Sequence, residues 1–243
     1  MKQFLIKVVR QLKGWILVIR PHLLFGWLSK PYLLAYNTLQ LSKWASKQDE
    51  KSILNDFYTA KRDYSKRYDL YQHVIDSQDL KEQSFDYFEF GVFGGSSFQW
   101  WLDNTTNKDS RYFGFDTFEG LPEAWGTFRK GEMTAEVPEV GDSRGEFIKG
   151  LFQDSVPVFL RNTEIDRNKR IILHLDADLF SSTLFALTTM APYLKKGDIL
   201  MFDEFNVPNH EFYAFKLFCD TYYIKTKLIG AVNNYYQVAF IIE

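Results

Sequence analysis

The sequence predicts an α/β protein in which helices cover both faces of a mostly parallel sheet. Short apolar runs typical of buried strands alternate with segments of helical periodicity along residues 85–223. Such alternation favours parallel strands that are joined by helical crossovers. The chain has 243 residues, of which 46% are hydrophobic, so it is long enough for one domain of this kind and an appendage.

Each element is predicted from its own pattern. The strands are FDYFEFGV (85–92), RYFGFD (111–116), EFIKGLF (146–152), RIILHLD (170–176) and GDILMFDEF (197–205). Apolar residues at helical spacing predict helices over 52–76, 96–104, 181–196 and 209–223. Two closing strands, KTKLIGA and YQVAFIIE, are joined through Asn233 and Asn234, which favour a hairpin. The last strand is therefore expected to run antiparallel to the others.

The charge distribution divides the chain into an arm, residues 1–50, and a domain, residues 51–243. Between Met1 and Gln48 there are eight Lys and Arg residues and no acid, whereas the remainder carries 21 basic and 31 acidic residues. The arm is also rich in Leu, Phe and Trp. We expect it to be helical.

The arm is predicted to contact a membrane without crossing it. Arg20, Pro21 and His22 interrupt its apolar run, which leaves pieces shorter than the roughly 20 residues of a membrane span. Cationic residues between Trp and Leu suit a helix that lies in a membrane interface, here through residues 1–48. The alternative is an arm that packs on a partner subunit of a homo-oligomer.

The single cysteine, Cys219, excludes a disulfide framework and a cysteine-rich zinc site. We therefore expect a cytoplasmic protein, peripheral on the inner face of the membrane if the arm binds lipid. The net charge of −2 gives no reason to expect a nucleic-acid partner. The long connection at 117–145 is predicted to be a lid or binding loop, because loops of that length in compact domains are commonly functional.

Four stretches place polar residues at the carboxyl ends of predicted strands, where ligands of parallel sheets gather. The first, EFGVFGGSS (89–97), ends a strand at Glu89 and opens a helix at Gly94 and Gly95. Glycines at this position permit close approach of a ligand to the backbone, although a tight strand-to-helix turn would also explain them. Their spacing is not that of a dinucleotide-binding loop. Glu89 could receive the ammonium group of a ligand.

The second stretch, GFDTFEGLPE (114–123), places Asp116 at a strand end, where an acid can accept both hydroxyls of a ribose. The alternative for Asp116 is a turn cap.

The third and fourth stretches, HLDADLFSST (174–183) and MFDEF (201–205), carry four carboxylates: Asp176, Asp178, Asp203 and Glu204. A buried carboxylate is costly unless it is paired or binds a metal ion. Oxygen ligands from adjacent strand ends suit Mg²⁺ or Mn²⁺ better than zinc. The alternative is that each acid caps an element, as Asp178 could cap the helix near Ser181.

Together, EFGVFGGSS, FDTFEGLPE, LDADLFSST and FDEF resemble the macrocin and novobiocin class of sugar O-methyltransferases, over about residues 60–230. This resemblance implies a Rossmann-like class I methyltransferase fold, S-adenosylmethionine and a divalent ion, Mg²⁺ or Mn²⁺, as cofactors, and a hydroxyl of a sugar or glycosylated acceptor as substrate.

The resemblance also implies roles for individual residues. The implied cofactor-binding residues are Glu89, Phe90, Gly91, Gly94, Gly95, Ser97, Asp116, Thr117, Phe152 and Asp154. The implied metal ligands are Asp176, Asp203 and Glu204, and the implied general base is Asp178. Glu204 departs from the family, which usually has Asp there. A metal ion would lower the pKa of the acceptor hydroxyl while Asp178 removes its proton.

Two other functions remain open at this stage. A D-x-D pair also occurs in metal-dependent glycosyltransferases, but these need basic residues for a diphosphate, and only Lys195 and Lys196 are near the acids in the sequence. The other is a non-catalytic, membrane-associated binding protein. His174, inside a predicted strand, is interpreted as a core residue, and His210 as a possible substrate contact.

Overall fold

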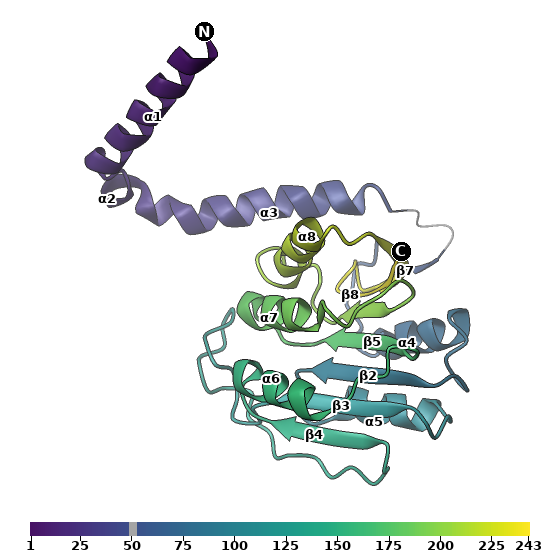
Figure 1. Cartoon of the computed structure of the whole chain (residues 1–243). Coiled ribbons are helices and arrows are strands. Elements are labelled where there is room, and N and C mark those ends of the chain that lie inside the picture. The colour runs from purple at the N-terminus through teal and green to yellow at the C-terminus, as the bar shows by residue number, and fades with distance from the viewer. Residues whose placement is uncertain (49–52) are drawn as a thin grey trace.

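The computed structural model describes residues 1–48 and 53–243 and contains one eight-stranded sheet (Figure 1). The strands are β1 (Leu54–Asn55), β2 (Phe85–Phe90), β3 (Arg111–Asp116), β4 (Gly145–Lys149), β5 (Arg170–Leu175), β6 (Ile199–Phe202), β7 (Thr226–Val232) and β8 (Gln237–Ile242). Their order across the sheet is β1-β7-β8-β6-β5-β2-β3-β4. The predicted boundary between arm and domain, at residues 50 and 51, lies outside the described residues.

The helices divide between the arm and the domain. Those of the arm are α1 (Lys2–Ile19), α2 (His22–Phe25), the 3₁₀ helix η1 (Gly26–Leu28) and α3 (Ser29–Ala45). Those of the domain are α4 (Lys66–Ser77), α5 (Ser96–Asn104), α6 (Phe152–Asn162), α7 (Phe180–Met190) and α8 (Glu211–Tyr222). In Figure 1, α6, α7 and α8 lie on one face of the sheet and α4 and α5 on the other.

The predicted fold class is confirmed. Neighbouring strands are parallel except where β8 pairs with β6 and β7. The last strand is therefore antiparallel, as Asn233 and Asn234 indicated; both residues adopt positive φ in the turn that joins β7 to β8. The helical character of the arm is likewise confirmed.

Two apolar cores hold the layers together, one on each face of the sheet. Along β2, Phe88 and Phe90 point into the core beneath α6, α7 and α8, whereas Phe85 and Tyr87 point into the core beneath α4 and α5. This alternation is the two-residue period of an extended strand. Because both faces are covered, β2 is buried along its whole length, and four of its six residues are aromatic.

Several predicted elements are wrong in extent. The helix expected over 181–196 ends at Met190, and the strand expected over 197–205 spans only Ile199–Phe202. The helix expected over 52–76 begins only at Lys66, and the chain before it forms β1 and an irregular segment. The side chains of Asn233 and Asn234 accept hydrogen bonds from the backbone of Asp63 and Thr59, which replace helical ones. The strand expected over 146–152 ends at Lys149, because Gly150 turns the chain into α6.

The arm is attached to the domain by the second half of α3. Trp44 packs on the rings of Phe205 and Phe240, with centroids 4.9 and 5.9 Å away, and Asn37 donates a hydrogen bond of 2.9 Å to Asn209. In contrast, α1 contains no buried residue and projects away from the domain (Figure 1). Within the described residues, none of the helices combines the length and the apolar character that crossing a bilayer would require.

Candidate active site

A cavity of about 650 Å³ opens at the carboxyl ends of the strands. It lies where the strand order reverses between β2 and β5, the usual ligand site of open α/β sheets. The two strand ends are tied by a hydrogen bond of 2.9 Å from the Asp176 amide to the Phe90 carbonyl. Of the predicted site residues, those that line the cavity are Gly91, Gly94, Ser97, Asp116, Thr117, Phe152, Asp176, Asp178 and Glu204.

The glycine loop between β2 and α5 is fixed by close backbone packing. Gly91 has φ of 94°, and a Cβ built there would lie 1.8 Å from the carbonyl oxygen of Asp176, so no other residue fits. Gly95 has φ of 75° and precedes α5. Gly94 has open space where a Cβ would be, so the backbone is accessible to a ligand at that residue.

Asp116 holds this loop from the neighbouring strand. Its Oδ2 accepts hydrogen bonds of 2.8 Å from the amides of Val92 and Phe93, and its Oδ1 accepts one of 2.8 Å from the amide of Phe118. Asp116 therefore does cap backbone amides, which is the alternative role that the sequence left open for it. A carboxylate has about four acceptor positions, so one remains for a ribose hydroxyl. The ribose contact stays a prediction.

Three of the predicted cofactor residues do not line the cavity at this loop: Glu89, Phe90 and Gly95. Glu89 is buried, and its oxygens accept hydrogen bonds from the hydroxyls of Tyr87, at 2.5 Å, and Ser97, at 2.6 Å. Through Ser97, Glu89 joins the end of β2 to the start of α5. Its contact with a ligand ammonium group stays a prediction.

The start of α6 forms another part of the wall. Phe152 lines the cavity and packs edge-on against Phe90, with ring centroids 5.2 Å apart. Asp154 is exposed and lies outside the lining, whereas its neighbour Gln153 belongs to it. The adenine contacts implied for Phe152 and Asp154 stay predictions. Thr117, which also lines the cavity, donates a hydrogen bond to the carbonyl of Gly120.

The four predicted acids do come together. Burial, together with the charges of Asp203 and Asp116, raises the pKa of Asp178 to about 6, although the neighbouring Glu204 side chain opposes this shift. Burial and the neighbouring Asp178 raise the pKa of Glu204 to about 9. The pKa of Asp176 is also raised, by burial and by Asp203. The surroundings therefore do not neutralise the negative charge that these acids would carry if all of them were ionised.

Asp178 has a backbone conformation suited to a functional role. Its φ of 56° lies in the left-handed region, and Leu179, not Asp178, is the N-cap of α7. The capping alternative for Asp178 is therefore wrong. Asp tolerates this region better than most residues, and strained backbone of this kind clusters at functional sites.

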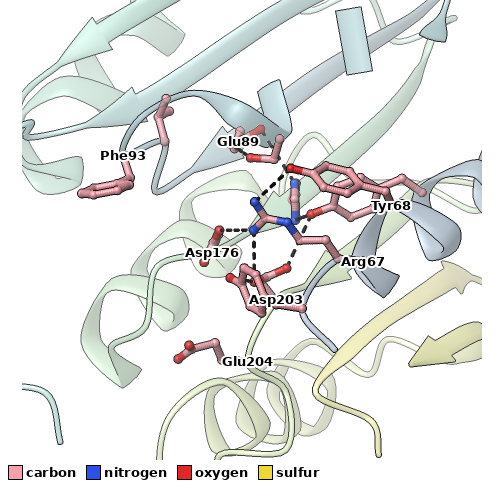
Figure 2. Close-up of polar contacts among 12 residues, drawn as sticks. Arg67, Tyr68, Glu89, Phe93, Asp176, Asp203 and Glu204 are labelled. Atoms are coloured by element: carbon pink, nitrogen blue, oxygen red, sulfur yellow. Dashed lines mark hydrogen bonds and ion pairs between the residues drawn. The ribbon is translucent and has the colours of Figure 1, made fainter. Parts of the chain in front are cut away.

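A cation from α4 lies at the acid cluster. A guanidinium nitrogen of Arg67 is 3.7 Å from Asp203 Oδ2 and 4.0 Å from Asp176 Oδ2, and Figure 2 shows Arg67 between these two acids. The Tyr64 hydroxyl donates a hydrogen bond to the same Asp203 oxygen. Asp203 is fully buried beneath these groups and does not line the cavity.

The implied metal ligands suit a divalent ion by their chemistry. Carboxylate oxygens are the preferred ligands of Mg²⁺ and Mn²⁺. Glu204 Oε2 is buried and has no hydrogen-bond partner, as expected of an oxygen that is free to bind a cation. Within residues 1–48 and 53–243, however, no three His, Cys, Asp or Glu side chains are arranged around one point for a metal ion. Arg67 occupies the neighbourhood of Asp176 and Asp203.

Several lining residues were not predicted from the sequence: Arg62, Tyr64, Arg67, Leu121, Trp125, Phe128, Met133, Ser182 and Tyr236. Those at 121–133 belong to the long loop, which the sequence did single out. Ser182 lies only four residues after Asp178, whereas Arg62, Tyr64, Arg67 and Tyr236 come from segments far from the acids along the chain. Arg62 and Arg67, which are distant from the acids in the sequence, line the cavity, whereas Lys195 and Lys196, the basic residues near the acids in the sequence, do not.

The two histidines interpreted from the sequence, His174 and His210, lie in different surroundings. His174 is buried in β5, with its Nδ1 2.7 Å from the Tyr87 hydroxyl and its Nε2 3.3 Å from the Tyr71 hydroxyl. It is a hydrogen-bonded core residue, as predicted. His210 is the N-cap residue of α8 and does not line the cavity; burial lowers its pKa.

Comparisons with known proteins agree with this geometry. The family model described as a methyltransferase domain matches residues 88–205. The calicheamicin methyltransferase CalS11 is 21% identical, with 85% of this chain and 91% of that chain covered and a TM-score of 0.55. The O-methyltransferase NovP is 19% identical, with 73% and 78% covered and a TM-score of 0.53. No curated protein matches the chain.

These comparisons confirm the resemblance found in the sequence. The matched region runs from β2 to the end of β6 and includes the glycine loop, Asp116 and the acid cluster. They support neither the glycosyltransferase nor the non-catalytic binding protein. Residues 88–205 match a methyltransferase domain, and the chain has the class I methyltransferase fold that the sequence predicted, which together support an enzyme that uses S-adenosylmethionine.

Proposed function

We propose that this methyltransferase acts on a hydroxyl group of a sugar or glycosylated acceptor and uses a divalent metal ion, Mg²⁺ or Mn²⁺. The observation that carries the proposal is the position of Asp178 in the cavity wall beside Glu204, with a pKa of about 6. A general base works best when its pKa lies near the pH of the reaction. CalS11 is described as a TDP-rhamnose 3'-O-methyltransferase, which supports a sugar acceptor.

In the proposed mechanism, Asp178 would accept the proton of the acceptor hydroxyl. S-adenosylmethionine, when bound, would supply the methyl group, with the thioether S-adenosylhomocysteine as the leaving group. The glycine loop and Asp116 hold S-adenosylmethionine, with Gly94 allowing close approach of the ligand. A divalent ion, when bound, lowers the pKa of a coordinated hydroxyl. Asp176, Asp203 and Glu204 would hold that ion.

The long loop 117–145 is proposed to be a lid over the acceptor. Leu121, Trp125, Phe128 and Met133 line the cavity from this loop, and the rings of Trp125 and Phe128 stack with centroids 5.5 Å apart. An apolar wall opposite the acids would exclude water from the reacting atoms, which strengthens the electrostatic interactions there.

The arm at 1–50 and the domain at 51–243 are proposed as separate functional units.

The test is methyl transfer from isotopically labelled S-adenosylmethionine to a panel of nucleotide sugars, glycosides and catechols, followed by mass spectrometry. We expect label on a sugar hydroxyl, no label in EDTA and recovery with Mg²⁺ or Mn²⁺. Labelling of catechols alone would refute the sugar acceptor. Full activity in EDTA would refute the metal requirement and leave the buried acids without a cationic partner other than Arg67.

A further inference from the structure

Helix α1 has one apolar side and one basic side. At 100° per residue, its apolar arc of about 140° is formed by Phe4, Leu5, Val8, Val9, Leu12, Trp15, Ile16 and Ile19. The rest of the circumference holds Lys2, Gln3, Lys7, Arg10, Gln11, Lys13 and Gly14, interrupted by Ile6, Leu17 and Val18. The apolar arc is therefore continuous, with Lys2 and Lys13 along one edge and Gln11 along the other.

No part of the described chain covers this apolar arc. The helix has no buried residue, and the exposed fractions of Phe4, Leu12 and Trp15 are 73%, 55% and 65%. The second half of α3 differs, because Leu41 and Trp44 pack on the core of the domain. Apolar patches of this kind mark an interaction surface.

The charge of the arm identifies what covers the arc. Residues 1–48 contain eight cationic side chains and no acid, so a second copy of α1 would bring only like charges to the same interface. An anionic lipid surface instead attracts each cation, by about 1 kcal/mol per Lys or Arg. Trp15, in the apolar arc, suits the headgroup level of a bilayer.

The position of the arm relates this surface to the cavity. Asn37 of α3 contacts Asn209, which follows the carboxyl end of β6, and α3 begins eight residues before Asn37, at Ser29. In Figure 1, α3 extends beyond the domain on the side to which the arrows of β2 and β5 point. The arm therefore leaves the domain on the side of the sheet where the cavity opens.

We propose that residues 1–28 bind the surface of an anionic membrane, with the apolar arc of α1 inserted at the headgroup level and its cations among the lipid phosphates. The helix would lie in the plane of the interface without crossing the bilayer. This binding does not depend on the proposed methyl acceptor.

The test is co-sedimentation of the full chain with vesicles of phosphatidylcholine alone or mixed with phosphatidylglycerol. Leu12→Glu and Gln3→Glu form a matched pair, because both change the charge equally but lie on opposite sides of α1. We expect the wild type and Gln3→Glu to sediment with anionic vesicles at low salt. Leu12→Glu should partition at least about tenfold less, the effect of losing one buried leucine, and high salt should release the wild type.

Three results would overturn the proposal. The first is a wild-type chain that stays in the supernatant with anionic vesicles at low salt. The second is equal partitioning of Leu12→Glu and Gln3→Glu. The third is a dimer, detected by light scattering, that Leu12→Glu dissociates while vesicles capture none of the protein. Thermal unfolding of each variant should match the wild type, since α1 contains no buried residue.

Discussion

The guanidinium group of Arg67 lies 3.7 Å from the carboxylate of Asp203, inside the acid cluster of the cavity. The contact joins α4 to the end of β6, two elements separated by most of the domain sequence. Arg67 also lies over the ring of Tyr64, 4.5 Å from its centroid, which fixes the side chain in this position. The protein thus supplies a cation of its own where the sequence predicts a metal ion.

The first prediction follows from this contact. Replacing Arg67 by Met should increase the affinity of the protein for Mn²⁺ by about tenfold, because a fixed positive charge beside two of the predicted ligands repels an incoming cation. The measurement is the free Mn²⁺ signal in electron paramagnetic resonance during titration of the purified protein. No substrate or activity assay is needed.

Lys66→Met is the matched control for Arg67→Met. Lys66 precedes Arg67 in the same helix but forms its ion pair with Asp56, at 2.8 Å, away from the acid cluster. Its replacement should leave Mn²⁺ affinity unchanged. If Arg67→Met weakens Mn²⁺ binding, Arg67 orients the carboxylates for the ion and does not compete with it.

The second prediction separates two glycines of the cofactor loop. Gly91→Ala should destabilise the domain by about 3 kcal/mol or more, because its Cβ would overlap the backbone of Asp176. Gly94→Ala meets no atom within 4 Å and should leave the unfolding temperature unchanged. If S-adenosylmethionine approaches the backbone there, Gly94→Ala should weaken its binding about tenfold, measured by calorimetry. Unchanged affinity would place the cofactor elsewhere.

The third prediction concerns Asp178 as the general base. Because its pKa is about 6, it is mostly ionised at pH 7 and becomes protonated as the pH falls. The kcat of the wild type should therefore decrease about tenfold per pH unit below pH 6. Asp178→Asn should lower kcat at pH 8 by about 10²–10⁴-fold and lose this pH dependence. An acidic limb that persists in Asp178→Asn would assign the base to another group.

Much of the fold could be predicted because its strands are buried on both faces. The runs around Phe88 and Ile172 are rich in the apolar and aromatic residues of buried strands, and the hairpin at Asn233 shows its own turn residues. Strand β1 could not be predicted, because it has two residues and depends on pairing with β7. Helix α6 was missed because Phe152 was assigned to the preceding strand.

The acids of the site could be predicted for a geometric reason. Parallel strands end at one edge of the sheet, so Asp176, Asp178 and Glu204 had to lie near each other there. Their partners could not be predicted. Arg67 and Tyr236 come from segments more than 30 residues away in the sequence, and the Tyr236 hydroxyl donates a hydrogen bond to Glu204 that only tertiary packing creates. Nothing in the local pattern around Arg67 distinguishes it from a surface arginine.

The last prediction is that Asp178→Asn, although it lowers kcat, is more stable than the wild type at alkaline pH. Folding raises the pKa of Asp178 from its ordinary value of 3.8 to about 6. A carboxyl group of this kind stabilises the fold below pH 3.8, and this contribution is lost as the pH rises through 6. Asparagine has no charge to bury, so in EDTA at pH 8 the variant should gain about 1–3 kcal/mol relative to the wild type. The gain should disappear near pH 4 in thermal unfolding experiments.

Asp154→Asn, which changes an exposed carboxylate at the same edge of the sheet, should show no such gain. An Asp178→Asn variant that is less stable than the wild type at pH 8 would mean that the carboxylate is neutralised by a partner, and that the lack of neutralisation inferred for this cluster is wrong.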